Sequence, residues 1–167
     1  RYFAHLGVAD EQLDSAHQAR AAQRHQKVMD VWRLQLDHNI AAFHRLAESE
    51  LALGILSNND GTAAEQMVTH GVCQVGEGEL PEVVAVIDST IVGMTKPDPR
   101  IFEPMLAALG LPSERVLYVG DTVHADVRGA TAAGLPVVQL DPLDLHADFD
   151  HPRLPDVAAV VELLSAP

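Results

Sequence analysis

The feature that most constrains this chain is an apolar run, Val116–Val119, that ends in Gly120-Asp121 and is followed by a second acid at Asp126. The run has the length and composition of a buried strand, and the residues after Asp121 resemble the start of a helix. Two carboxylates at the carboxyl end of such a strand form a typical site for a hard divalent cation, which takes oxygen ligands. Because magnesium combines one or two carboxylates with substrate phosphate, the segment predicts phosphate chemistry.

Short apolar runs alternate with helical segments from Leu51 onward. This alternation predicts an α/β fold with a parallel sheet and helices on both faces. In such sheets, ligands bind at the carboxyl ends of the strands. The expected strands are Leu51–Leu56, Val83–Ile87, Arg115–Val119 and Pro136–Leu140.

Several helix boundaries are marked by capping signals. Asp37 can cap a helix, and Thr62 with Glu65 has the spacing of a capping box. Asp98 precedes Pro99, the usual pairing of an N-cap with proline at the first helical position. Further helices are expected to end at Gly110, to span His124–Ala133 and to span Asp156–Leu164.

Three further polar positions follow the expected strands. Ser57 and Asn58 end an apolar run, where a hydroxyl and backbone N–H groups can hold phosphoryl oxygens. Lys96 lies in the stiff segment Met94-Thr95-Lys96-Pro97-Asp98-Pro99, which suits a lysine that points inward at a charge. Taken alone, the first pair is better explained as a polar turn and Lys96 as a surface residue. Their combination with Asp121 and Asp126 is far more specific.

Composition limits the possible partners and compartment. The net charge of −13 argues against nucleic acid but not against a small phosphorylated substrate, because a cation and one lysine can reverse the sign locally. Cys73 is the only cysteine, which indicates a reducing, cytoplasmic compartment. No apolar run approaches the roughly 18 residues that a membrane span needs. The sequence does not indicate an oligomeric state or a particular substrate.

In order and placement, these elements resemble the motifs of the haloacid dehalogenase (HAD) superfamily. The second motif of that family, a strand ending in Ser or Thr, matches Leu53–Ser57, and its inward lysine matches Lys96. Its fourth motif, Gly-Asp with a second Asp five residues later, matches Asp121 and Asp126. The resemblance covers roughly residues 39–164 and implies a HAD-like Rossmannoid core.

The resemblance also implies roles for these residues in a Mg²⁺-dependent phosphatase. Asp121 and Asp126 would form the metal site, Asp126 either as a ligand or through water and Lys96. Lys96 would neutralise charge on the nucleophile and the phosphoryl group. Ser57 and the backbone of Asn58 would bind phosphoryl oxygens. Residues 1–36 would be part of a helical cap that chooses the substrate, and residues 37–167 the α/β core.

The first motif of the family is not found in these residues. It is a strand ending in Asp-x-Asp-x-Thr, whose first Asp becomes phosphorylated and whose second acts as general acid and base. Asp148-Phe149-Asp150 is the only Asp-x-Asp, and because no buried strand precedes it we interpret it as a loop. The motif is expected upstream of Arg1, so these residues are expected to be a fragment that is inactive on its own.

The absence of this strand has a structural consequence. In the family, the first strand lies between the strand that ends at Ser57 and the one that ends at Gly120. A structure of these residues should therefore show a gap between those two strands, with an apolar edge on each side.

Two alternatives to a phosphatase stay open. One is a 2-haloacid dehalogenase-like hydrolase, although its fourth motif typically begins Ser-Ser-Asn rather than Gly-Asp. The other is a catalytically inactive HAD-fold protein with a binding or regulatory role. The reading frame upstream of Arg1 would discriminate the enzyme from this second alternative.

Overall fold

The computed structural model describes residues 36–165. The chain divides after Leu36 into two units, and the predicted cap, residues 1–36, lies outside the described residues except for Leu36. The second unit contains strands β1 (Ile55–Ser57), β2 (Gln74–Val75), β3 (Glu82–Val83), β4 (Val86–Asp88), β5 (Tyr118–Gly120), β6 (Val137–Leu140) and β7 (Arg153–Leu154). Its α-helices are α3 (Asp37–Ala47), α4 (Ala63–Thr69), α5 (Ser89–Val92), α6 (Glu103–Leu109), α7 (Arg128–Ala132) and α8 (Val157–Ser165). Two 3₁₀ segments, η2 (Pro99–Phe102) and η3 (Ser113–Arg115), and a π-helical segment, η4 (Val123–Val127), complete it.

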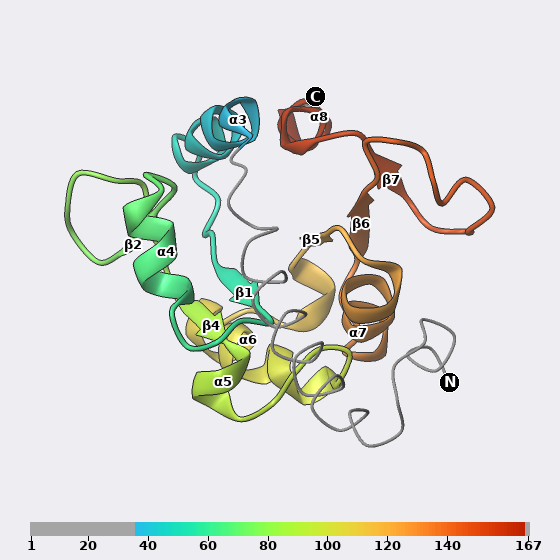
Figure 1. Ribbon diagram of the computed structural model, residues 1–167, viewed down its shortest axis with the longest axis horizontal. Helices are drawn as coiled ribbons and strands as arrows, with labels where there is room; N and C mark the ends of the chain where they lie inside the picture. The colour runs from blue at the N-terminus through green and yellow to red at the C-terminus, as the bar shows by residue number, and fades with distance from the viewer. Residues whose placement is uncertain (1–35, 166–167) are drawn as a thin grey trace, which may run out of the picture. The chain divides into compact units, whose positions relative to one another are not determined.

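All strand pairs of the described part are parallel. β1 pairs with β4, β2 pairs with β3, and β5, β6 and β7 form a three-stranded sheet in that order. The predicted α/β class is therefore confirmed. Helices α3 and α8 pack against each other on one side of these strands, and the Asn39 side chain accepts a hydrogen bond from the Val157 amide at 3.0 Å. Helices α6 and α7 lie on the other side (Figure 1).

A cluster of buried apolar residues packs against β5 and β6. Ile101, Phe102, Ala130 and Leu135 are buried together there, because η2 and α7 direct their apolar faces at the same strands. The Phe102 ring meets the Tyr118 ring edge-on, with centroids 5.1 Å apart. This packing fixes the position of β5 and therefore of the residues that follow it.

Strands β1 and β5 do not pair with each other in the described residues, so the sheet is interrupted between them. A cavity of about 340 Å³ lies at this interruption. Residues 52–56 and 116–119 line it at the sides, Phe43 and Val157 come from α3 and α8, and Met105 comes from α6. The cavity thus extends from one helical layer to the other, and the described part of the chain contains the gap expected from the sequence.

Two local predictions were wrong. The run Val83–Ile87 is not one strand, because the chain pairs with β2 through Val83 and crosses to β1 by Val86. Thr62 precedes α4 but makes no side-chain cap, since its hydroxyl donates to Asp60 and accepts from Gln66. The predicted helix N-cap at Asp98 is confirmed, because its carboxylate accepts a hydrogen bond from the backbone amide of Arg100.

The region after β5 also differs in detail from its prediction. Arg115 belongs to η3, and β5 itself begins at Tyr118. The expected helix His124–Ala133 is composed of the π-helical segment η4 followed by α7. This segment matters for the site, because it contains Asp126, whose side chain lies against Gly120 at the end of β5.

Candidate active site

Lys96 connects the ends of β1 and β5. Its Nζ atom lies 2.6 Å from Oδ1 of Asp126 and 2.8 Å from the hydroxyl oxygen of Tyr118. It also donates to the carbonyl oxygen of Leu56 at 3.4 Å. The lysine side chain is 9% exposed and the Asp126 side chain 3%, so this is a nearly buried ion pair.

The carboxylate of Asp126 is fully engaged by four donors. Oδ1 accepts from Lys96 and from the Tyr118 hydroxyl, the latter at 2.9 Å. Oδ2 accepts from the amide and the hydroxyl of Thr122, at 2.8 and 2.6 Å. Because each oxygen already has two donors, Asp126 is better placed to orient Lys96 and Thr122 than to contact a cation directly.

Gly120 is required by the close approach of Asp126. A Cβ atom at position 120 would lie 2.5 Å from both Cβ and Cγ of Asp126, too near for any residue with a side chain. The Gly-Asp pair in the sequence therefore has two separate causes: the glycine admits Asp126, and the next residue presents its own carboxylate.

Asp121 is the exposed member of the acidic pair. Partial burial raises the pKa of its carboxyl, and the nearby charge of Asp126 raises it further. Burial would also raise the pKa of Asp126, but hydrogen bonds from Lys96 and Thr122 outweigh it and lower this pKa to about 2. The ionised form of Asp121 is therefore disfavoured, and a bound cation would stabilise it.

The donor set fits magnesium better than a metal that requires a protein cage. Among residues 36–165, no three His, Cys, Asp or Glu side chains are grouped as metal ligands. Magnesium keeps several water ligands and needs only one or two carboxylates plus substrate oxygens. An exposed Asp121 beside the charge of Asp126 meets this requirement.

The loop after β1 is tied to Lys96 through Asn58. Ser57 ends β1, where it lies opposite Asp88 of β4. The side-chain Nδ2 atom of Asn58 donates to the backbone carbonyl of Lys96 at 3.0 Å. The side-chain Oδ1 atom of Asn58 accepts from the backbone N–H of Lys96 at 2.9 Å. The side chain of Asn58 thus positions the lysine, and phosphate binding at this residue would involve its backbone.

Asp88 is a structural element of the site that the sequence analysis missed. Its buried carboxylate accepts from the amides of Gly61, Ala63 and Thr90 at 2.9 to 3.1 Å. It therefore holds the loop that follows β1 and the start of α4. The available signal was an acid at the end of the apolar run Val83–Ile87.

The Asp-x-Asp of the sequence, Asp148-Phe149-Asp150, does not belong to this site. Asp148 and Asp150 are exposed residues of the turns between β6 and β7, as predicted from the absence of a preceding strand.

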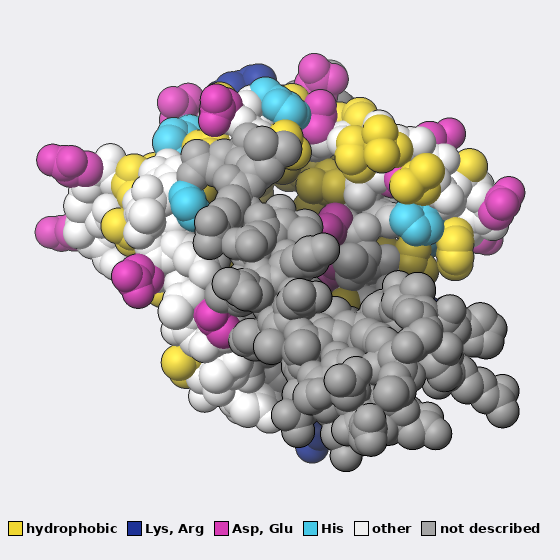
Figure 2. Space-filling view, viewed as in Figure 1, with side chains coloured by type: hydrophobic (Ala, Val, Ile, Leu, Met, Phe, Trp, Pro, Cys, Tyr) yellow, Lys and Arg dark blue, Asp and Glu magenta, His cyan; other side chains and the backbone are white. Residues whose placement is uncertain are grey.

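Acidic side chains are spread over the face shown in Figure 2, and basic ones are few. No helix of the described part is long and apolar enough to cross a membrane.

Comparison with known proteins identifies the family. The family model of haloacid dehalogenase-like hydrolases matches residues 2–140, so the chain belongs to that family. It is 37% identical over 91 residues to phosphoserine phosphatase of Thermus thermophilus, covering 54% of this chain and 34% of the relative. It is 30% identical over 136 residues to phosphoglycolate phosphatase of Rhodospirillum rubrum, which covers 80% of this chain and 54% of the relative. An (S)-2-haloacid dehalogenase of Pseudomonas putida is 32% identical over 96 residues, which covers 58% of this chain and 39% of the relative.

Solved structures share the same fold. The magnesium-bound HAD-hydrolase YfnB of Bacillus subtilis superposes with a TM-score of 0.66 at 18% identity, covering 78% of this chain and 56% of that one. This likeness shows the HAD fold. The chain spans about a third to a half of the length of the curated relatives described above.

Proposed function

We propose that this chain contributes to a Mg²⁺-dependent phosphatase of a small phosphorylated metabolite that works through an aspartyl-phosphate. The observation that carries the proposal is the buried Lys96–Asp126 pair between the ends of β1 and β5, with the Asp121 carboxylate exposed beside it. A cation held by Asp121 would neutralise charge on the phosphoryl group. Lys96 would stabilise the same charge from the other side. The Ser57 hydroxyl and the backbone N–H of Asn58 would bind phosphoryl oxygens.

The nucleophile in this proposal is an aspartate on a strand between β1 and β5. The apolar cavity between these strands and the absence of pairing between them in the described part of the chain support this placement. A strand that enters there would end beside Ser57, Lys96 and Asp121. Its first aspartate would attack phosphorus, and its second would give and take the proton.

A phosphatase is favoured over a dehalogenase by Asp121. Displacing halide from carbon needs no metal, whereas Asp121 offers an exposed carboxylate at a site that favours a cation. The relatives include both activities, so similarity alone does not separate them. A non-catalytic binding protein is the remaining alternative, and it predicts no turnover under any condition.

A strand-addition experiment tests the proposal. The 167-residue chain alone should leave an aryl phosphate intact in the presence of Mg²⁺. A fusion with an apolar strand ending in Asp-x-Asp-x-Thr ahead of Arg1 should hydrolyse it. In that fusion, Asp121→Ala should lower turnover by about 100- to 1,000-fold.

Three outcomes would contradict the proposal. Turnover by the unextended chain that is lost in Asp121→Ala would show that no added nucleophile is needed. Halide release from a 2-haloacid without phosphate hydrolysis would indicate the dehalogenase instead. A folded fusion that is inert toward both substrates would favour the binding protein.

A further inference from the structure

Gln139 provides a buried amide directly beside the metal-binding turn. It lies in β6 opposite Gly120 of β5, and its side chain is completely buried. Its Nε2 atom donates to the carbonyl oxygen of Asp121 at 3.0 Å and lies 3.1 Å from Nδ1 of His146. Its Oε1 atom lies 2.7 Å from Nε2 of His151. The Nε2 atom of this amide therefore has two partners, and the Oε1 atom has one.

The partners determine how the amide is oriented. In this orientation the amide NH₂ group donates to Nδ1 of His146, an atom that also lies 3.6 Å from Oδ1 of Asp141. An amide oxygen only accepts, so Nε2 of His151 carries the proton that it donates. The reverse orientation of Gln139 would place its oxygen against the carbonyl oxygen of Asp121. The Asp121 carbonyl thus selects this orientation, and the two histidine contacts hold the amide in it.

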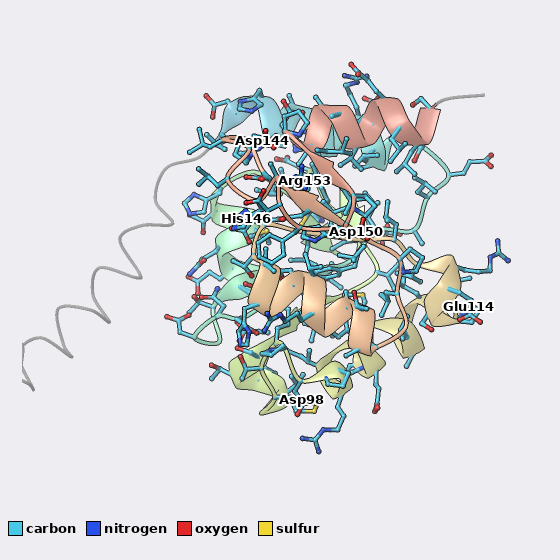
Figure 3. The ribbon with its side chains drawn as sticks, turned by 90° about the vertical axis from the view of Figure 1, so that its right-hand side faces the viewer. Asp98, Glu114, Asp144, His146, Asp150 and Arg153 are labelled. Atoms are coloured by element: carbon cyan, nitrogen blue, oxygen red, sulfur yellow. The ribbon has the colours of Figure 1, made fainter. Side chains whose placement is uncertain are left out.

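The connection between β6 and β7 is held in place near His146. Asp141 is buried and accepts from the amides of Leu145 and His146, at 3.0 and 2.8 Å. Arg153 approaches its carboxylate from β7, with Nε 3.7 Å from Oδ2. Figure 3 shows Asp144 and His146 on this connection and Arg153 in the strand that follows it, away from Asp98 and Glu114. A continuous set of contacts therefore runs from this connection to Asp121.

We propose that Gln139 is a positioning residue for the metal ligand Asp121, and that His146 and His151 keep its amide in the working orientation. The inference rests on the proposed function, because it takes Asp121 as the ligand. The physical reason is that a bond to the Asp121 carbonyl fixes the backbone from which the carboxylate projects. Groups that orient a metal ligand in this way typically change metal affinity by about 10- to 100-fold.

The test uses Mn²⁺ as a paramagnetic probe of the full chain, followed by NMR line broadening. In the parent protein, broadening should be centred on the amides of residues 120–122 and be absent in Asp121→Asn. Gln139→Leu keeps the volume of the side chain but removes its hydrogen bonds. It should raise the Mn²⁺ concentration at half-broadening by about tenfold. His151→Ala should shift it in the same direction by a smaller factor.

A matched control separates positioning from general loss of stability. Val161→Ala removes buried volume from α8, which packs against α3, and should lower the melting temperature without moving the Mn²⁺ midpoint. If Gln139→Leu does not fold, the shift in His151→Ala decides. An unchanged midpoint in the informative variant, with localised broadening in the parent, overturns the inference alone. Absence of localised broadening in the parent overturns the proposed metal site together with it.

Discussion

The side-chain amide of Asn58 pairs with the backbone of Lys96 through two hydrogen bonds, one in each direction, at 2.9 and 3.0 Å. The residues are 38 positions apart in the chain, and Asn58 occupies both polar groups of the Lys96 peptide backbone. The loop after β1 therefore sets the position from which the lysine side chain reaches Asp126.

Asn58→Ala should impair turnover much more than folding. Both its hydrogen bonds to Lys96 are lost, yet the position is exposed, so water can replace them. We expect kcat of the strand-extended chain to fall by about 100-fold, because a misplaced catalytic group costs about that factor. The free energy of unfolding should fall by about 1 kcal/mol. Urea denaturation and steady-state kinetics measure the two effects, and an unchanged kcat would contradict the role of Asn58.

Lys96→Met should destabilise the fold strongly. The substitution leaves the buried Asp126 carboxylate without its cation, and breaking a buried pair in this way costs about 3 to 5 kcal/mol. The matched control is Arg100→Met, which breaks an ion pair whose arginine side chain is 67% exposed and should leave the unfolding midpoint almost unchanged. Equal effects of the two substitutions in urea would show that Lys96 is not a buried partner.

Asp121→Asn should raise stability near neutral pH without metal. The folded-state pKa of Asp121 is raised, so its ionised form is disfavoured by folding and the fold carries a penalty at pH values above that pKa. The gain should be on the order of 1 kcal/mol or less, because the group is partly exposed. It should shrink as the pH falls toward the usual carboxyl range, where Asp121 becomes protonated in both states.

Magnesium should reverse this order at neutral pH. Saturating Mg²⁺ stabilises the parent by mass action and leaves Asp121→Asn unchanged. Melting temperatures with and without Mg²⁺, with Ca²⁺-free buffers throughout, measure both effects. If Asp121→Asn melts below the parent without metal, the repulsion between the two acids is not as described.

Asp88→Ala should lower the free energy of unfolding by about 3 kcal/mol, because it leaves three backbone amides without their acceptor. Asp148→Ala is the control, since that acid is an exposed residue of the turns between β6 and β7. Urea denaturation of both variants measures the difference. A loss in Asp88→Ala no larger than in the control would show that the loop after β1 does not depend on this carboxylate.

The positions of the strand ends could be predicted from the sequence, because they depend on short runs of apolar residues. The apolar runs before Ser57 and Gly120 located the strand ends, and strand ends locate ligands in parallel sheets. The strand limits were predicted less well. β5 is three residues long and starts at Tyr118, since η3 includes Arg115 and the next two residues are extended chain without strand pairing. Hydrophobic periodicity does not distinguish a short strand from the extended chain that leads into it.

The contacts that organise the site were beyond local pattern. Asn58 bonds to Lys96 across 38 positions, and Gln139 bonds to Asp121 across 18. Which partner a polar side chain finds depends on the packing of whole elements, and no spacing rule describes it. Asp126 lies in the π-helical segment η4, and its ion pair with Lys96 likewise joins residues 30 positions apart.

The interrupted sheet gives Lys96 a second importance. The proposed phosphate-binding residues belong to the β1 half of the sheet and the acidic pair to the β5 half. The lysine ammonium group donates to both halves, to Leu56 on one side and to Tyr118 and Asp126 on the other. A strand inserted between the halves would have to fit the distance that this one ammonium group already bridges. The length of the Lys96 side chain therefore limits the distance between the two halves at which both can still contact the same phosphoryl group.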